Sequence, residues 1–252
     1  MTKIILNGCG GRMGKMITSL ASSDGSIDIV AGVDVAEVSG APFPVFARIR
    51  DCDIAADAVI DFSLPEGTDE LLDYCAERSL PVVLCTTGLS EAQLNKVKKT
   101  SERVAVLRSA NMSFGVNLLM KLLKEAAVKL AGEGFDIEIV EKHHAGKKDA
   151  PSGTAIALAE SVNDALGGEY EFVFDRSSRS EKRPEKEIGI SAVRGGTIPG
   201  DHDVIFAGED EVLTFSHRAY SRAVFAKGAL AAGKFLARCA PGLYTMADVI
   251  GD

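Results

Sequence analysis

The sequence predicts an α/β protein with two parts: a doubly wound parallel sheet at the N-terminal end, and a C-terminal α+β domain with an open mixed sheet. Three observations support this prediction. Strand and helix signals alternate over roughly the first 110 residues. A glycine-rich turn, residues 8–14, separates the first expected strand from the first expected helix. Between residues 187 and 216, strand-like runs follow one another without helices between them, which is typical of antiparallel or mixed sheets.

In the first part, short apolar runs predict the strands and helical periodicity predicts the helices between them. Met13, Met16, Ile17 and Leu20 recur at steps of three and four residues and indicate a helix. Pro65 suits the first turn of a helix, and Ser90 can cap one. Strands are expected over 3–7, 27–33, 58–62, 81–85 and 104–107, and helices over 12–22, 65–77 and 90–99. This alternation indicates a parallel sheet covered on both faces.

In the second part the order of signals changes. Helices are expected over 115–130, 155–166 and 221–238, and strands over 135–140, 187–193, 204–207 and 212–216. The polar run 176–186 is expected to be a solvated loop; the alternative is a basic contact for a ligand or a neighbouring subunit. No internal repeat is present.

The amino-acid composition and net charge argue against several classes of protein. The 252 residues carry 28 Lys and Arg against 36 Asp and Glu, a formal net charge of −8, and 46% are hydrophobic. This composition excludes a disordered or collagen-like chain, and the acidic balance argues against nucleic-acid binding. No apolar run reaches the ~18 residues of a membrane span. Five cysteines without a CxxC spacing indicate reduced thiols in a cytoplasmic protein rather than a disulfide or zinc framework.

The turn Gly8-Cys9-Gly10-Gly11-Arg12-Met13-Gly14 lies in the strand-to-helix context of a Rossmann-like dinucleotide site. Its glycines would let the backbone approach a pyrophosphate at the start of the helix. Asp34 stands 20 residues after Gly14 (34 − 14) and can accept hydrogen bonds from an adenine ribose. The alternative is a glycine-rich turn with an unrelated aspartate. Because Asp34 would repel a 2′-phosphate, we expect NADH to be preferred and NADPH to be accepted, with Arg12 as one nearby cation.

Two further segments follow expected strands and are placed to touch the nicotinamide end of such a cofactor. They are Thr86-Thr87-Gly88 and Ser109-Ala110-Asn111-Met112. Ligands of open α/β sheets lie beyond the carboxyl ends of the strands. The alternative reading of both segments is ordinary turn chemistry.

The richest cluster of reactive side chains is residues 141–154, Glu-Lys-His-His-Ala-Gly-Lys-Lys-Asp-Ala-Pro-Ser-Gly-Thr. A histidine can exchange a proton near neutral pH, and a lysine can donate a proton or hold a carboxylate. Ser152, Gly153 and Thr154 precede an expected helix and can form an anion seat. Together they suit a small anionic substrate that is reduced and protonated. A zinc site at His143-His144 has little support, because adjacent histidines rarely bind one ion. The glycine-rich loop 194–202 could border the same pocket.

With these motifs in order, the whole chain resembles the dihydrodipicolinate reductase (4-hydroxy-tetrahydrodipicolinate reductase) family of the bacterial and plant diaminopimelate route to lysine. The resemblance rests on residues 8–14, Asp61-Phe62-Ser63 with Pro65, 86–88, 111–117, 194–202 and, above all, 141–154. It implies a dinucleotide-binding domain over 1–112 and 223–252, and a substrate-binding and oligomerisation domain over 113–222. It further implies a homotetramer, a small dicarboxylate substrate, no metal, and a cytoplasmic location, or a plastid if the source is a plant, although no transit peptide is apparent.

The resemblance also implies roles for individual residues. His143 would be the proton donor/acceptor and Lys147 a proton donor that also contacts substrate. His144, Ser152, Gly153 and Thr154 would bind the substrate. The cofactor would be lined by Gly8, Cys9, Gly10, Gly11, Arg12, Met13, Asp34, Cys85, Thr86, Thr87, Ser109, Ala110, Asn111 and Met112. Cys85 stands where the family usually has glycine, and Val35 where it often has arginine.

Two alternatives remain at this point. One is another nicotinamide-dependent reductase of a small amino or dicarboxylic acid, such as an aspartate or aspartate-semialdehyde enzyme, for which Cys85 is the only cysteine placed to be a nucleophile. The other is a non-catalytic nucleotide sensor.

Overall fold

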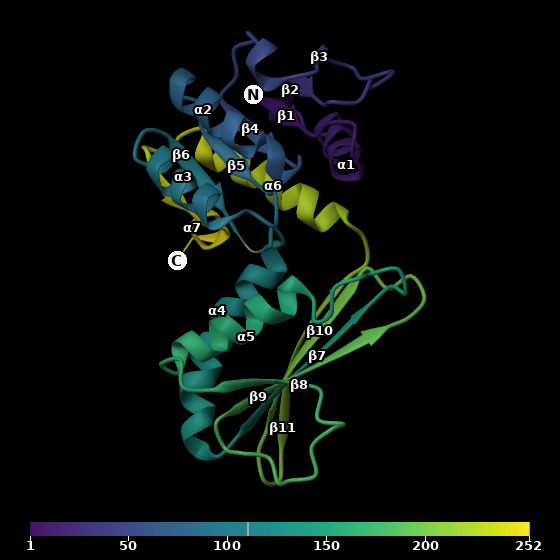
Figure 1. The fold of residues 1–252 in the computed structure, drawn as a ribbon, viewed down its shortest axis with the longest axis vertical. Helices are drawn as coiled ribbons and strands as arrows, with labels where there is room; N and C mark the ends of the chain where they lie inside the picture. The colour runs from purple at the N-terminus through teal and green to yellow at the C-terminus, as the bar shows by residue number, and fades with distance from the viewer. Residues whose placement is uncertain (110, 252) are drawn as a thin grey trace. The chain divides into compact units, whose positions relative to one another are not determined.

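The computed structural model describes residues 1–109 and 111–251, and it confirms the predicted fold class. The chain forms two compact units, one built from Met1–Phe114 with Arg222–Asp252 and the other from Gly115–Ser221 (Figure 1). No helix among the described residues is long and apolar enough to cross a membrane.

The first unit contains a seven-stranded sheet in which all strands are parallel, in the order β12-β6-β5-β4-β1-β2-β3. The chain starts at β1 in the middle, winds outward to β2 and β3, and then returns to build β4 to β6 on the other side. The reversal lies between β1 and β4, and ligands of open α/β sheets bind at such a reversal. The strands are β1 Thr2–Asn7, β2 Ile27–Val33, β3 Val45–Phe46, β4 Ala58–Asp61, β5 Val82–Leu84, β6 Ala105–Arg108 and β12 Gly242–Tyr244.

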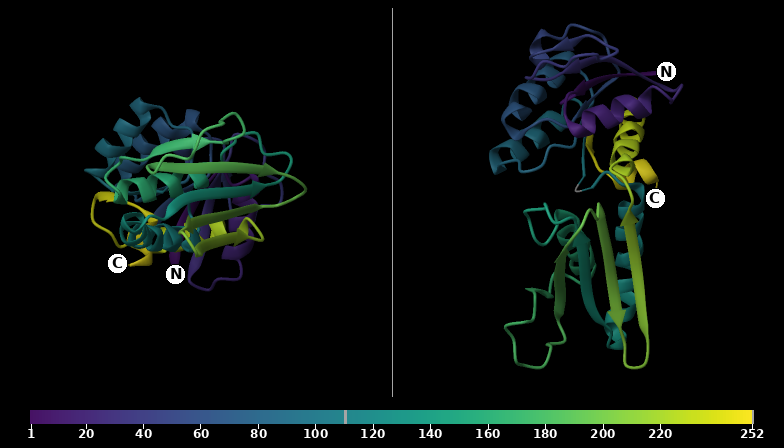
Figure 2. Two further views of the ribbon diagram at one scale, coloured as in Figure 1. Left: turned by 90° about the horizontal axis from the view of Figure 1, so that it is seen from below. Right: turned by 90° about the vertical axis from the view of Figure 1, so that its right-hand side faces the viewer.

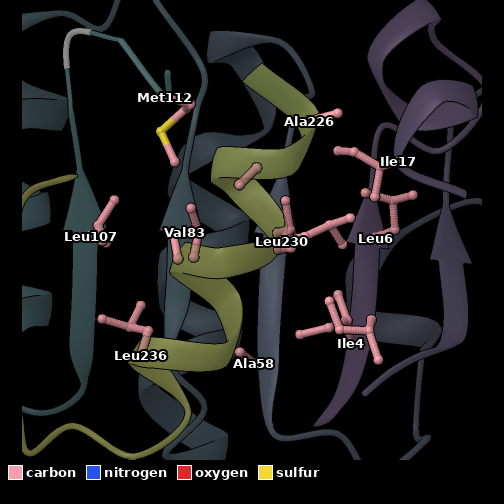
Figure 3. Close-up of a cluster of buried hydrophobic side chains, with 14 of the residues drawn as sticks. Ile4, Leu6, Ile17, Ala58, Val83, Leu107, Met112, Ala226, Leu230 and Leu236 are labelled. Atoms are coloured by element: carbon pink, nitrogen blue, oxygen red, sulfur yellow. The ribbon is translucent and has the colours of Figure 1, made fainter. Parts of the chain in front are cut away.

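Helices cover both faces of this sheet because successive strand residues point to opposite sides. Ile4 and Leu6 face one helical layer and Ile5 faces the other. The first layer holds α1 (Arg12–Ala21) and α6 (Ala223–Leu236), and Figure 3 shows α6 lying across the strands on this face. The second layer holds α2 (Thr68–Arg78) and α3 (Glu91–Ser101). Short helices complete the unit: η1 Ile49–Asp51, η2 Pro65–Gly67 and α7 Met246–Ile250.

The second unit is a five-stranded mixed sheet in the order β11-β10-β7-β9-β8, with two helices on one face (Figure 2). β8 and β7 run parallel to β9, and β10 runs antiparallel to β7 and β11. The helices α4 and α5 bury Leu123 and Leu158 against Ile137 and Ile139 of β7. Its elements are α4 Phe114–Leu130, η3 Ala131–Glu133, β7 Asp136–His143, α5 Gly153–Ala165, β8 Glu171–Phe174, β9 Glu187–Arg194, β10 Gly200–Ala207 and β11 Val212–Ala219.

The longer predicted elements are present, with shifts of a few residues at their ends. Ser90 caps α3 in a capping box with Gln93. The elements absent from the sequence analysis are β3, β8, β12, α7 and the short helices η1 and η3, which span two to five residues. Such short segments hold too few residues for a periodic signal, and neighbouring strands or helices stabilise them.

The polar run 176–186 differs from a freely solvated loop. Arg176 pairs with the buried Glu187. Arg183 bonds Glu138 (3.0 Å) and the Ile137 carbonyl oxygen (3.0 Å). These arginines therefore bind the loop to the sheet of their own unit.

Close packing of α6 gives the first prediction. A Cβ at Gly228 would overlap the carbonyl oxygen of Met112, whereas one at Gly233 would meet only the ends of Ile60 and Ile4 side chains at 3.1 and 3.2 Å. Both substitutions add helix propensity of about 1 kcal/mol. We expect Gly228→Ala to lower the free energy of unfolding by about 1–3 kcal/mol, and Gly233→Ala to change it much less.

Urea unfolding of the two variants and the wild type measures this difference. Equal stability of all three proteins would show that the α6 backbone is not held against residue 112.

Candidate functional site

The glycine turn after β1 has no space for side chains at its key positions. A Cβ at Gly8 would stand 2.6 Å from the carbonyl oxygen of Phe62, and one at Gly14 would overlap the carbonyl oxygens of Gly8 and Cys9. Gly8 also has a positive φ of 80°, which glycine adopts without strain. The turn can therefore bring α1 close to β1.

Asp34 follows β2, as predicted, and binds the glycine turn directly. Its carboxylate oxygens accept hydrogen bonds from the N–H of Gly10 (2.9 Å) and the N–H of Ala36 (3.0 Å). The N–H groups of Gly8 and Cys9 bond the Val33 carbonyl oxygen at the end of β2 (2.8 and 3.2 Å). Asp34 and the glycine turn are separated in the sequence, but they are therefore in direct contact in the fold.

A cavity of about 800 Å³ opens at this turn. Of the predicted cofactor residues, Gly8, Gly10, Gly11 and Asp34 line it. The exposed side chains of Val35 and Leu64 also belong to its wall. The sequence analysis did not assign the remaining wall residues: Lys15, Ala36, Glu37, Val38, Ser39, Phe62, Ser63, Glu66 and Gly67.

A buried carboxylate, Asp61, ties together the ends of β1, β4 and β5. It accepts hydrogen bonds from Asn7 Nδ2 (2.8 Å), Ser63 Oγ (2.6 Å) and Thr86 Oγ1 (2.6 Å). Burial raises the pKa of Asp61, and these hydrogen bonds oppose the rise. Thr86 is buried with its hydroxyl engaged, so it positions its loop and leaves Thr87, which is exposed, as the open side chain of the pair.

The other predicted cofactor residues that the structure describes lie outside the wall of this cavity. Arg12 is exposed, and Met13 and Met112 pack into the α1–α6 core. Cys9 is buried, so its backbone alone can face a ligand. Ser109 and Asn111 are partly exposed after β6, and Asn111 Oδ1 accepts from the Ser113 N–H (2.8 Å). Ala110 lies outside the described residues.

Cys85 does not have the environment of a nucleophile. Burial and the negative charge of Asp61 raise the pKa of its thiol well above the usual range. A reactive cysteine needs the opposite shift. This disfavours the semialdehyde-type chemistry that would require a thiolate at this position.

The residues of the first unit fit a nicotinamide dinucleotide. The turn has no space for side chains at Gly8 and Gly14, which suits the close approach of a pyrophosphate, and Asp34 beside the turn offers acceptor oxygens to a ribose. The apolar Val35 and Leu64 offer contact area for a base.

The second unit places a buried acid at the centre of its polar cluster. Glu141 of β7 is fully buried. Its Oε1 accepts from Arg194 Nη2 (2.7 Å) and the Ser152 N–H (2.9 Å), and its Oε2 from Arg194 Nη1 (2.8 Å) and His143 Nδ1 (2.6 Å). Burial raises the pKa of Glu141, but the hydrogen bonds from Arg194 and His143 outweigh it and hold the pKa below its ordinary value.

Two histidine rings lie side by side in this cluster. His143 and His202 pack edge to face with ring centroids 5.2 Å apart. His202 Nε2 lies 3.0 Å from Ser152 Oγ, and Ser152 Oγ accepts from the Ala155 N–H (3.1 Å) to cap α5. Burial and the neighbouring His143 lower the pKa of His202 to about 4, so it is neutral at physiological pH.

The loop between β7 and α5 carries the other predicted substrate residues. Lys147 Nζ bonds Asp149 (2.7 Å), which lowers the pKa of that carboxyl group. His144 is partly exposed, and the space where a Gly153 side chain would lie is open. Gly153 and Thr154 follow the Ser152 cap at the start of α5, and a helix N-terminus of this kind can bind an anion.

The sequence analysis identified His143, His144, Lys147 and the start of α5. It placed Arg194 and His202 only in a loop that could border the pocket, and it gave Glu141 no role of its own. One signal was available: the alternation of β7 puts Ile137, Ile139, Glu141 and His143 on the same buried face. No group of three or more His, Cys, Asp or Glu able to hold a metal ion occurs in the part of the chain that the structure describes.

Two family models match the chain. The model described as "Dihydrodipicolinate reductase, N-terminus" matches residues 2–112, and the one described as "Dihydrodipicolinate reductase, C-terminus" matches residues 115–250. Among curated proteins, a 4-hydroxy-tetrahydrodipicolinate reductase from Caldanaerobacter subterraneus is 51% identical over 99% of this chain and 98% of its own length. One from Clostridium novyi is 49% identical over 99% and 98%.

Solved structures share the fold. A dipicolinate-bound dihydrodipicolinate reductase from Paenisporosarcina sp. superposes with a TM-score of 0.81 at 23% identity, covering 98% of each chain. GenD2 from gentamicin A biosynthesis, solved in complex with NAD, gives a TM-score of 0.61 at 12% identity over 99% of this chain and 90% of that one.

The burial of His202 generates a prediction for stability against pH. The unfolded chain binds a proton at His202 below about pH 6.5, whereas the folded chain does so only below about 4. The contribution of His202 is therefore complete above pH 6.5 and lost as the pH falls toward 4. It amounts to about 3 kcal/mol.

Urea unfolding of the wild type and His202→Gln at pH values across this window tests the effect. We expect the free energy of unfolding to fall more steeply with acid in the wild type than in the variant. Parallel pH dependences would contradict the assignment of a neutral, buried His202.

Proposed function

The chain belongs to the dihydrodipicolinate reductase family, and we propose from this premise how its residues carry out the family's reaction. The enzyme is an oxidoreductase that reduces 4-hydroxy-tetrahydrodipicolinate to tetrahydrodipicolinate in the diaminopimelate route to lysine, with a nicotinamide coenzyme as reductant. The observation that carries this conclusion is the match of both family models and of curated relatives near 50% identity along the full chain.

We propose that the first unit, residues 1–112 with 223–252, binds the coenzyme. Gly8, Cys9, Gly10 and Gly11 would contact the pyrophosphate through their backbone, and Asp34 would accept hydrogen bonds from the adenine ribose. The remaining predicted contacts are Arg12, Met13, Cys85, Thr86, Thr87, Ser109, Ala110, Asn111 and Met112. When bound, the coenzyme supplies a hydride.

The second unit, residues 113–222, is proposed to bind the substrate. The start of α5, with Ser152, Gly153 and Thr154, suits one carboxylate, because its N–H groups are free of side-chain obstruction at Gly153. Lys147 and His144 would hold the other polar groups of the diacid. The dipicolinate bound to the Paenisporosarcina enzyme supports a small dicarboxylate as the ligand of this site.

The reaction consumes one hydride and one proton and releases one water. Loss of the 4-hydroxyl as water gives an unsaturated cyclic imine, which takes the hydride at ring C4. The chain's task is then to deliver a proton to the ring, and His143 with Lys147 is proposed to do so. General acid catalysis of this kind accelerates a reaction roughly 10²–10⁴-fold.

We further propose that the enzyme works in the cytoplasm as a homotetramer assembled through the sheet of the second unit. One face of that sheet is covered by α4 and α5. The other face presents partly exposed side chains such as Val140 and Ile205, which a second copy of the sheet could cover.

The environment of Asp34 predicts a preference for NADH. A 2′-phosphate would meet the carboxylates of Asp34, Glu37 and Glu66 in the cavity wall, with Lys15 as a cation in that wall. We expect a lower KM for NADH than for NADPH, and Asp34→Ser should narrow the gap. Initial rates with both coenzymes measure this, and a wild type that used NADPH equally well or better would refute it.

The role of His143 is tested with dihydrodipicolinate synthase product as the substrate. Wild-type enzyme should oxidise NADH only when this product is present. His143→Gln should lower kcat roughly 10²–10⁴-fold and leave NADH affinity intact, because it removes a proton donor and no coenzyme contact. Unchanged turnover would remove His143 from the chemistry, and a wild type inactive with both coenzymes would refute the function.

A further inference from the structure

The buried acid Glu141 has no role of its own in the proposed reaction, yet it is fully enclosed by hydrogen-bond donors. Four donors surround it: His143 Nδ1, the Ser152 N–H and two nitrogens of Arg194. A guanidinium and a backbone amide can only donate, so three of the four contacts require acceptor oxygens. The fourth contact has the same requirement, because an ionised carboxylate has no proton to give. His143 must therefore carry its proton on Nδ1.

We propose that Glu141, held in place by Arg194, is a positioning residue that fixes His143 as the Nδ1–H tautomer and so makes Nε2 the atom that exchanges a proton with the substrate. The proposal rests on the proposed function, in which His143 is the proton donor/acceptor. Arg194 balances the charge of Glu141, so a neutral His143 can remain bonded to the acid. Acid–imidazole pairs in hydrolases fix a tautomer in the same way.

Two further contacts fix the ring. His202 packs edge-on against it, with centroids 5.2 Å apart. Gly200, at the start of β10, lies beside Nε2, and a Cβ built there would stand 3.0 Å from that atom. The missing side chain at Gly200 therefore leaves room at the edge of the ring that the proposal makes reactive.

The effect of Glu141→Gln follows from the number of hydrogen-bond donors that face each of the two carboxylate oxygens. An amide NH2 in the place of Oε1 would face two obligatory donors, Arg194 Nη2 and the Ser152 N–H. In the place of Oε2 it would face only one, Arg194 Nη1, because His143 can switch its Nδ1 to an acceptor. The second arrangement has fewer conflicts, and it moves the histidine proton from Nδ1 to Nε2.

The test combines spectroscopy with kinetics. The chain has only four histidines, so ¹⁵N-histidine labelling with His→Gln variants assigns the signal of residue 143. At alkaline pH we expect the proton on Nδ1 in the wild type and on Nε2 in Glu141→Gln. Glu141→Gln should lower kcat on the order of 10²-fold without raising the KM for NADH. Glu141→Asp, which keeps an acceptor, should retain the Nδ1–H tautomer and part of the turnover.

Two comparisons separate positioning from structural damage. In a His143→Gln background, Glu141→Gln should change kcat by less than about twofold, because both variants remove the same function. The matched control is Glu138→Gln, which removes another arginine-paired acid from β7 (Arg183, 3.0 Å) and should change neither tautomer nor kcat.

A wild-type proton on Nε2, an unchanged tautomer in Glu141→Gln, or equal kcat losses in both backgrounds would each overturn the proposal. If Glu141→Gln does not fold, the wild-type and Glu141→Asp tautomers decide. If the wild type reduces no substrate, the proposed function fails, and the tautomer measurement still decides whether Glu141 sets the state of His143.

Discussion

Each unit depends on one carboxylate buried near the carboxyl end of a strand. Moving an ionised carboxylate out of water is costly unless hydrogen-bond donors enclose it. For Asp61 the donors come from the ends of β1 and β5 and from the turn after β4, and for Glu141 they come from β7, β9 and the cap of α5. Supplying each acid with its hydrogen-bond donors therefore fixes the positions of several loops that are distant from one another in the sequence. Those loops are the ones that carry the proposed contacts to coenzyme and substrate.

The features predictable from the sequence are those with a local signal. The glycine turn, the acid after β2 and the apolar stripe of α1 are each encoded within about one turn or strand. Asp34 was identified because its distance from the turn has a known geometric meaning. The hydrogen bond that it accepts from the Gly10 N–H adds a role that the sequence did not show. The carboxylate that is expected to bind the ribose also holds the glycine turn in place.

The network around Glu141 could not be predicted in the same way because its members meet through sheet register. Arg194 lies 53 residues away from Glu141, and the parallel pairing of β7 with β9 sets it opposite His143. His202 stands directly opposite Glu141 through the antiparallel pairing with β10. A strand pattern indicates which face a residue occupies, but it does not indicate which strand lies alongside. The alternation of β7 does place Glu141, a charged residue, on the apolar face of the strand, and this pattern is a signal in the sequence that the residue is unusual.

The same register explains how two neighbouring histidines acquire different properties. His143 and His202 are in ring contact, but only His143 has a carboxylate partner. His202 is buried without one, so its pKa falls and it stays neutral, with Ser152 of the α5 cap as its neighbour. A neutral His202 therefore adds no positive charge beside His143 and Arg194. The environment thus separates an imidazole paired with a carboxylate, to which we assign the proton transfer, from one that contacts the cap of α5, although the two side chains are chemically identical.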